Sequence, residues 1–273
     1  MKIEETKVLS GFIRLCNDGW TQGWHERNGG NATYRMKTEE VEECRSFFFE
    51  NDNWIPLDVV MENLAGEYFI TTGTGKHFNN VILEPEISLG ITEINAKGDA
   101  YRIVWGLNGG KDRPTSEFPT HLLNHSIKKA ANPEYRMIYH AHPIHLIALT
   151  FVLPLDSKSF TKALWKTMTE CPIIFPHGIA VLPWMVPGGV DIAKATSALV
   201  GEFDAVVWAH HGIFCMGTNF DTTFGLMHTI EKSAAIYMDI LHTGKPILQT
   251  ISDEQLLMLE EPYNVKLNRD FID

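Results

Sequence analysis

The chain has 273 residues, 44% of them hydrophobic, which is enough to fill a substantial core in one large domain or two small ones. Its formal net charge of −11, from 34 acidic and 23 basic residues, argues against nonspecific binding to nucleic acid or to anionic membranes. An anionic substrate would therefore need local positive charge, such as a metal ion or backbone N–H groups.

The start of the chain, Met1-Lys2-Ile3, lacks the apolar core of a signal peptide, and no stretch is long and apolar enough to cross a bilayer. These features predict a soluble, cytoplasmic protein. Its four cysteines are far apart in the sequence and form no C-x-x-C pair, which is typical of reduced thiols that pack in the core. They are Cys16, Cys44, Cys171 and Cys215.

Apolar residues at helical spacing predict a first amphipathic helix from Glu4 to about Gly23. The turn Asn28-Gly29-Gly30-Asn31 follows it and leads into a short predicted strand over residues 32–36. The turn has two interpretations. It is a plain connection between helix and strand, or it presents backbone N–H groups and amides to an anion, because glycine allows close approach.

A strand is predicted over residues 67–72, and Gly73-Thr74-Gly75-Lys76 turns out of it. This turn is not a phosphate-binding P-loop, because His77 follows the lysine and Ile70 occupies the place of the first glycine. Either a plain turn or a generic anion-binding turn remains. The preceding aromatic segment, residues 41–64, shows no clear pattern.

Two further strands are predicted over residues 89–95 and 100–105. The turn Lys97-Gly98-Asp99 that joins them has the composition of a hairpin. Strands linked by so short a turn must be antiparallel. The sheet is therefore not the parallel sheet of a doubly wound fold.

Pro114 to Pro119 opens another predicted helix, with Thr115 or Ser116 as its cap and Glu117 in its first turn. Capping alone explains these three residues. A functional interpretation uses the helix start to bind phosphate and the carboxylate of Glu117 as a base.

His140-Ala141-His142 predicts a strand that carries two imidazoles on one face, with Cβ atoms roughly 7 Å apart. Two imidazoles at this spacing can bind one metal ion, and a catalytic site usually has three protein ligands. The third candidate is His210 or His211, after the predicted strand over residues 204–208, and spacing does not choose between them. The alternative is that these histidines only pack in the core.

The rest of the chain alternates helices with short apolar strands. Helices are predicted over residues 142–153, 160–169, 191–201 and 221–242, and a last short helix is capped by Ser252. Residues 213–216 are predicted to pair back across Gly212. With no repeat or linker, the sequence predicts a single domain over residues 1–273, a sheet covered by helices.

Taken together, these motifs resemble the class II, zinc-dependent aldolases that cleave sugar 1-phosphates. The resemblance covers nearly the whole chain, and the Leu182–Gly188 segment points to the branch that acts on rhamnulose phosphate. Its landmarks are Trp24-His25-Glu26-Arg27-Asn28-Gly29-Gly30-Asn31, Thr72-Gly73-Thr74-Gly75-Lys76, Pro114-Thr115-Ser116-Glu117, His140-Ala141-His142, Leu182-Pro183-Trp184-Met185-Val186-Pro187-Gly188, His211-Gly212 and Phe224-Gly225-Leu226.

The resemblance implies a role for each matching residue. Glu117 would be the catalytic acid/base, and Glu170 would reach a neighbouring subunit's site in a homotetramer. The zinc ligands would be His140, His142 and His211. The phosphate of a small sugar phosphate would be bound by Asn28, Gly30, Asn31, Thr74, Gly75, Thr115 and Ser116. The implied fold is a three-layer α/β/α domain with a largely antiparallel central sheet.

Three alternatives stand beside this interpretation. The first is a sibling activity on the same scaffold, such as L-fuculose-1-phosphate aldolase or pentulose-phosphate 4-epimerase. The second is a hydrolase that uses a metal-bound hydroxide. The third is a non-enzymatic, adducin-like binding module, against which the three histidines and Glu117 argue. Three imidazoles also accept cobalt, nickel or copper, so zinc rests on the resemblance.

Overall fold

The computed structural model describes residues 2–273, and these form two compact units. The first unit comprises the residues up to 141 together with residues 216–223, and the second comprises residues 142–215 and 224–273. Helices and nine β-strands together make an α/β fold. The single domain expected from the sequence stays a prediction.

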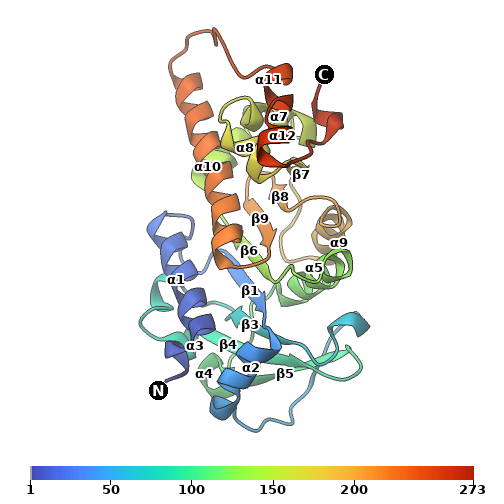
Figure 1. The fold of residues 1–273 in the computed structure, drawn as a ribbon. Coiled ribbons are helices and arrows are strands. Elements are labelled where there is room, and N and C mark those ends of the chain that lie inside the picture. The colour runs from blue at the N-terminus through green and yellow to red at the C-terminus, as the bar shows by residue number, and fades with distance from the viewer. Residues whose placement is uncertain (1) are drawn as a thin grey trace. The chain divides into compact units, whose positions relative to one another are not determined.

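The first unit contains the N-terminal helices, which are blue in Figure 1, and six strands. Its helices are α1 (Lys7–Thr21), α2 (Thr38–Cys44), α3 (Pro85–Ser88), α4 (Leu107–Gly110) and α5 (Phe118–Ala131), with short 3₁₀ turns at Ile3–Glu5, Arg45–Phe47, Glu62–Leu64 and Phe78–Asn80. Its strands are β1 (Asn31–Arg35), β2 (Ile55–Pro56), β3 (Tyr68–Thr72), β4 (Leu89–Ile94), β5 (Ala100–Gly106) and β6 (Met137–Ala141).

These six strands follow the order β2-β5-β4-β3-β1-β6, and every pair is antiparallel. The hairpin of β4 and β5 confirms the interpretation of the Lys97-Gly98-Asp99 turn. All residues of β1 and β6 are buried, so these two strands are covered on both faces. The register between β1 and β6 therefore decides which side chains meet on each face.

The second unit contains the remaining strands and most of the C-terminal helices. Its elements are α6 (Ile144–Leu149), α7 (Ser157–Trp165), α8 (Glu170–Ile174), β7 (Ala180–Leu182), α9 (Val190–Leu199), β8 (Ala205–Trp208), β9 (Gly212–Gly217), α10 (Phe220–His242), α11 (Asp253–Leu257), α12 (Glu260–Tyr263) and a 3₁₀ turn at Arg269–Phe271. The end of β9 and the start of α10 belong to the first unit.

Strand pairing in the second unit is mixed. β7 and β8 are parallel, whereas β8 and β9 are antiparallel and meet across a tight turn. The predicted return of the chain at Gly212 is thus confirmed, and the strand pairs of the protein are largely antiparallel. No helix within residues 2–273 has the length and apolar composition needed to cross a membrane.

Several predicted boundaries were wrong. The helix predicted over residues 142–153 is only α6, which ends at Leu149. It begins after Pro143, because helical conformation is disfavoured for the residue before a proline. The strand with His140 ends at Ala141, so His142 lies just beyond it. The segment 41–64, for which the sequence predicts no element, contains the end of α2, two 3₁₀ turns and the two-residue β2, with irregular chain between them. The four cysteines are buried free thiols, as predicted.

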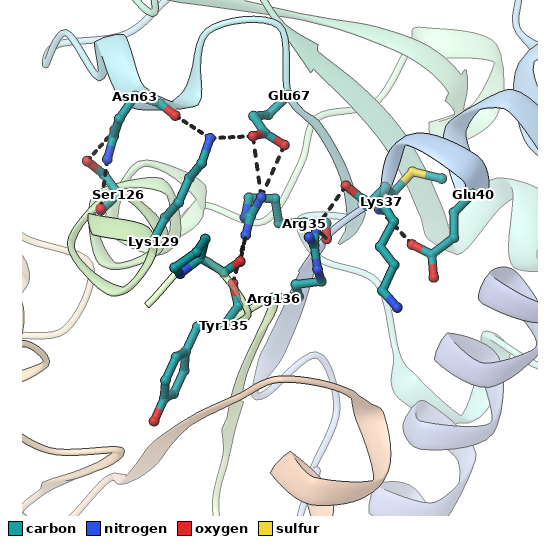
Figure 2. Close-up of polar contacts among 11 residues, drawn as sticks. Arg35, Lys37, Glu40, Asn63, Glu67, Ser126, Lys129, Tyr135 and Arg136 are labelled. Atoms are coloured by element: carbon teal, nitrogen blue, oxygen red, sulfur yellow. Dashed lines mark hydrogen bonds and ion pairs between the residues drawn. The ribbon is translucent and has the colours of Figure 1, made fainter. Parts of the chain in front are cut away.

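Arg35, at the C-terminal end of β1, links the strand to its neighbours through a buried ionic network (Figure 2). Its guanidinium group donates to both carboxylate oxygens of Glu67 at 3.3 Å and to the carbonyl oxygens of Pro133 and Tyr135. Lys129 of α5 donates to the same Glu67 carboxylate. The network ties β1 to the connection between α5 and β6.

Removing the Arg35 side chain should destabilise the protein strongly, because Glu67 would lose the guanidinium nitrogen that contacts both of its carboxylate oxygens and two carbonyl groups would lose a donor. We expect Arg35→Ala to lower the free energy of unfolding by about 3 kcal/mol. Arg14→Ala is the matched control, because the Arg14–Asp221 pair is exposed, and it should cost less than about 1 kcal/mol. Urea denaturation measures both values, and equal losses would contradict the importance of the network.

Candidate active site

Three histidines form the group that is best suited to hold a metal ion. His140 is buried, His142 and His211 are partly buried, and their ligand nitrogens all lie within 4.8 Å of one another. The ring centroids of His142 and His211 are 4.9 Å apart. Neutral imidazoles are common ligands of divalent transition metals, and three of them leave a coordination position for water or substrate. The donor set therefore fits a metal ion.

His210 is held by a different part of the second unit. Its backbone N–H and its ring Nδ1 both lie close to the hydroxyl oxygen of Thr150, at 3.1 and 3.0 Å, and its ring packs on Phe151. His210 has a φ of 61°, in the left-handed region. With this backbone conformation, the side chains of His210 and His211 point in different directions. The structure thus groups His211, and not His210, with the two histidines near β6.

The register of β1 and β6 brings Glu117 to the face of His140. Asn31 lies directly opposite His140 in this pair, and residues opposite each other have side chains on the same face of a sheet. The Asn31 side-chain amide donates to Oε2 of Glu117 at 2.9 Å. Glu117 is only 9% exposed. A buried carboxylate is therefore fixed beside a strand that ends at the histidine group.

Glu117 does not lie in the first helical turn, as the sequence suggested, but is the N-cap residue of α5. Neither Thr115 nor Ser116 caps the helix. The Thr115 hydroxyl instead accepts a hydrogen bond from the backbone N–H of Glu117 at 3.3 Å, which shapes the turn that precedes α5. This turn directs the carboxylate toward β1.

Two loops that the sequence singled out lie side by side. Gly73 and Pro114 form an isolated antiparallel bridge, and the N–H of Thr74 donates to the carbonyl of Arg113 at 2.9 Å. The N–H of Thr115 donates to the carbonyl of Thr72 at 2.8 Å. The loop at Thr74-Gly75 is therefore held against the loop at Thr115-Ser116.

The start of β1 joins these loops, because the N–H of Ala32 donates to the Thr72 hydroxyl at 3.2 Å. The three predicted phosphate-binding segments thus converge in the first unit. Their side chains divide between exposed and buried: Asn28, Thr74, Gly75 and Ser116 are exposed, Gly30 is partly exposed, and Asn31 and Thr115 are buried.

The turn at Asn28–Asn31 is built on His25, a residue that the sequence did not single out for a role. His25 Nδ1 contacts the carbonyl oxygen of Gly29 at 3.0 Å and therefore donates, so Nε2 accepts from the Tyr139 hydroxyl at 2.6 Å. The ring stacks on Phe78. A Cβ atom at Gly30, where φ is +77°, would lie 2.4 Å from His25 Nδ1. Only glycine fits this turn.

Glu231 of α10 is a second residue that the sequence did not single out for a role. Its carboxylate accepts from the backbone N–H groups of His145 and Leu146 at 3.0 and 2.9 Å, and also contacts Nδ1 of His145. Glu231 thus caps α6 by accepting hydrogen bonds from N–H groups of its first turn, directly after His142 and Pro143. No local sequence signal could have identified a cap that lies 86 residues away in the chain.

Glu170 is the first residue of α8, and its side chain is exposed. Its assignment to the site of a neighbouring subunit stays a prediction.

Comparison with known proteins gives a consistent result. Residues 11–238 match the family described as class II aldolase and adducin N-terminal domain. The chain is 41% identical over 269 residues to a rhamnulose-1-phosphate aldolase of Listeria innocua, covering 98% of this chain and 95% of the relative. It is 42% identical over 264 residues to the rhamnulose-1-phosphate aldolase of Escherichia coli K12, with 96% of each chain covered.

Solved structures share the fold. A sugar-phosphate aldolase from Thermotoga maritima superposes with a TM-score of 0.74 at 27% identity, covering 86% of this chain and 95% of its own. An L-fuculose 1-phosphate aldolase superposes with a TM-score of 0.61 at 18% identity, covering 96% and 98%. At 18% identity, the second comparison bears on the fold alone.

The different surroundings of the adjacent histidines give a direct test. We expect His211→Ala and His142→Ala to lose most of the bound metal, because each removes one of three ligand nitrogens. His210→Ala is the control and should keep the metal. Metal content after extensive dialysis, measured by plasma mass spectrometry, distinguishes these outcomes. Full metal retention in His211→Ala, or loss in His210→Ala alone, would contradict the grouping.

Proposed function

Since the chain belongs to the class II aldolase and adducin family, we propose that it is an aldolase that cleaves L-rhamnulose 1-phosphate into dihydroxyacetone phosphate and L-lactaldehyde, with zinc as its metal. Relatives of 41 to 42% identity over nearly the full length carry the name rhamnulose-1-phosphate aldolase. The substrate is then a small sugar phosphate. Zinc is proposed because three imidazoles suit it and it is widely available.

One observation carries the proposal. Asn31 lies opposite the first histidine of the group, His140, and its amide also binds the Glu117 carboxylate. A retro-aldol cleavage needs both functions: stabilisation of negative charge on the substrate oxygens, and a group that moves a proton. The β1–β6 pair supports both from one face of the sheet.

The chemistry is a cleavage of the C3–C4 bond of the ketose. A bound divalent ion would act as a Lewis acid for the negative charge that develops on the C2 oxygen. His140, His142 and His211 would hold it, and as neutral ligands they leave its positive charge undiminished. The ionised Glu117 carboxylate would take the proton of the C4 hydroxyl as the C3–C4 bond breaks and the aldehyde forms. It would then deliver that proton to C3, which becomes the hydroxymethyl carbon of the triose phosphate.

The phosphate would bind where the three loops of the first unit converge. Asn28, Thr74 and Ser116 expose an amide and two hydroxyl groups there, and Gly30 and Gly75 allow close approach of the backbone. Asn31 and Thr115 support this cradle from below the surface. Neutral donors of this kind bind a phosphate dianion without requiring a cluster of basic side chains.

The second candidate is a sibling activity, because an L-fuculose 1-phosphate aldolase has the same fold. A pentulose-phosphate 4-epimerase would use similar chemistry, since it also breaks and remakes this kind of bond. We further propose a cytoplasmic homotetramer in which Glu170 reaches a neighbouring subunit's site.

The proposal is tested by following dihydroxyacetone phosphate release from L-rhamnulose 1-phosphate with purified protein. We expect release that disappears after chelation and returns when zinc is added. Cleavage of L-fuculose 1-phosphate, but not of L-rhamnulose 1-phosphate, by the same zinc-loaded sample would establish the sibling activity instead. Release that is indifferent to chelation would rule out the metal mechanism.

Glu117→Gln separates proton transfer from binding, because glutamine has nearly the same shape but does not act as a base. We expect turnover to fall by about 10² to 10⁴-fold while metal content stays that of the wild-type protein. Steady-state kinetics with parallel metal analysis measures both quantities. Unchanged turnover would remove Glu117 from the mechanism.

A further inference from the structure

A chain of buried hydrogen bonds leads from Glu117 into the interior of the first unit. After the Asn31 amide, it continues from Oδ1 of Asn31 to Nε2 of His121, from Nδ1 of His121 to the Thr33 hydroxyl at 2.8 Å, and from that hydroxyl to Nε2 of His125 at 2.9 Å. Thr33 and His121 are fully buried, and His125 is 1% exposed.

The chemistry of these groups permits one direction of donation. An ionised Glu117 only accepts, so the NH₂ group of Asn31 faces it and the Asn31 carbonyl oxygen faces His121. Nε2 of His121 must then carry a hydrogen. In a neutral imidazole this leaves Nδ1 as an acceptor, so the hydrogen on that contact comes from the Thr33 hydroxyl.

The next link follows in the same way. Thr33 has one hydroxyl hydrogen, which is used toward His121, so its oxygen accepts from Nε2–H of His125. This arrangement requires a neutral His121, because its Nδ1 must accept a hydrogen bond. Burial lowers the pKa of His121 to about 3, and burial together with the nearby His121 lowers the pKa of His125 well below its ordinary value.

The geometry of α5 and β1 explains why this chain of hydrogen bonds forms. Glu117, His121 and His125 are spaced by four residues and lie along one stripe of α5 and its N-cap. Asn31 and Thr33 are two residues apart on β1 and share a face. Three residues of this stripe therefore meet one face of the strand through four hydrogen bonds.

We propose that Thr33, His121 and His125 are positioning residues for the cleavage reaction: they fix the Asn31 amide with its NH₂ group toward Glu117, and so hold the carboxylate in place as a proton acceptor. This inference rests on the proposed function. An Asn amide rotated by 180° would present its oxygen to the carboxylate and repel it, and the neutral Nε2–H of His121 prevents that rotation.

A merely structural role would have a different signature. If these hydrogen bonds only satisfy buried polar groups, removing them lowers the stability of the protein but leaves the turnover of the folded protein unchanged. If these hydrogen bonds position Glu117, their removal lowers kcat more than it changes KM, because the exposed side chains of the proposed phosphate cradle, Asn28, Thr74 and Ser116, take no part in them. The two roles are therefore separable by kinetics.

The pair Thr33→Val and Thr33→Ser tests this. Valine has the shape of threonine without the hydroxyl group, whereas serine keeps it. We expect Thr33→Val to lower kcat by about 10-fold or more, with KM changed less than about 3-fold, since small displacements of catalytic groups are costly. Thr33→Ser should restore most of the loss. Metal content and melting temperature are measured on the same samples.

Thr161→Val is the matched control. Thr161 is fully buried and its hydroxyl also makes two hydrogen bonds, with the backbone N–H and carbonyl of Ile179. We expect it to lower the melting temperature without lowering kcat. A Thr33→Val protein with wild-type kcat would overturn the inference, as would an equal fall of kcat in Thr161→Val.

The histidine tautomers provide a readout that does not depend on activity. In protein labelled with ¹⁵N-histidine, we expect His121 and His125 to be neutral with the hydrogen on Nε2, and His121→Gln assigns its signal. Glutamine also places an NH₂ group near the position of Nε2, so this variant should keep more activity than His121→Phe. A charged ring or an Nδ1–H tautomer for His121 would refute the directional chain.

Failure of the proposed function has a separate signature. Wild-type, zinc-loaded protein that does not cleave L-rhamnulose 1-phosphate refutes that function, whatever the tautomers are. Active wild-type protein with an equally active Thr33→Val variant refutes the positioning role alone.

Discussion

The pairing of β1 with β6 is the constraint on which the rest of the site depends. In this register Asn31 faces His140 and Thr33 faces Ile138, on two strands that are buried along their whole length. A shift by one residue would turn both β1 side chains to the opposite face of the sheet. The Arg35 network at the other end of β1 opposes such a shift, because it bonds the strand to Glu67 and to carbonyl groups ahead of β6.

The buried polar side chains from Glu117 to His125 are stable because each one is hydrogen-bonded to the next. An unsatisfied buried donor or acceptor costs about 1 to 3 kcal/mol, which makes the arrangement from Glu117 to His125 sensitive to any single loss. The same low-dielectric surroundings keep the histidines neutral. Burial thus determines their protonation, and their protonation determines the direction in which Asn31 donates.

The sequence was sufficient for features that depend on neighbouring residues. The hairpin at Lys97-Gly98-Asp99 followed from turn chemistry. The nearness of His140 and His142 followed from their spacing, although His142 lies beyond the end of the strand. The sequence could not choose between His210 and His211, because that choice depends on Thr150, about sixty residues away, and on a left-handed backbone at His210. The spacing of His121 and His125 from Glu117 was visible, but their partner Thr33 lies on a distant strand. The short turns in residues 41–64 were not predicted, because such short elements show no hydrophobic periodicity.

A net charge of −11 and a phosphate dianion as substrate are compatible on physical grounds. At physiological ionic strength the Debye length is about 8 Å, so most of the acidic surface is screened from a ligand at the site. Lys76, next to Gly75, is already paired with Asp112 at 2.6 Å and contributes little free charge. Attraction at the proposed cradle must then come from donors at contact distance, namely N–H groups, hydroxyl groups and an amide. Such donors are held in place by the folded backbone, because the three loops are hydrogen-bonded to one another.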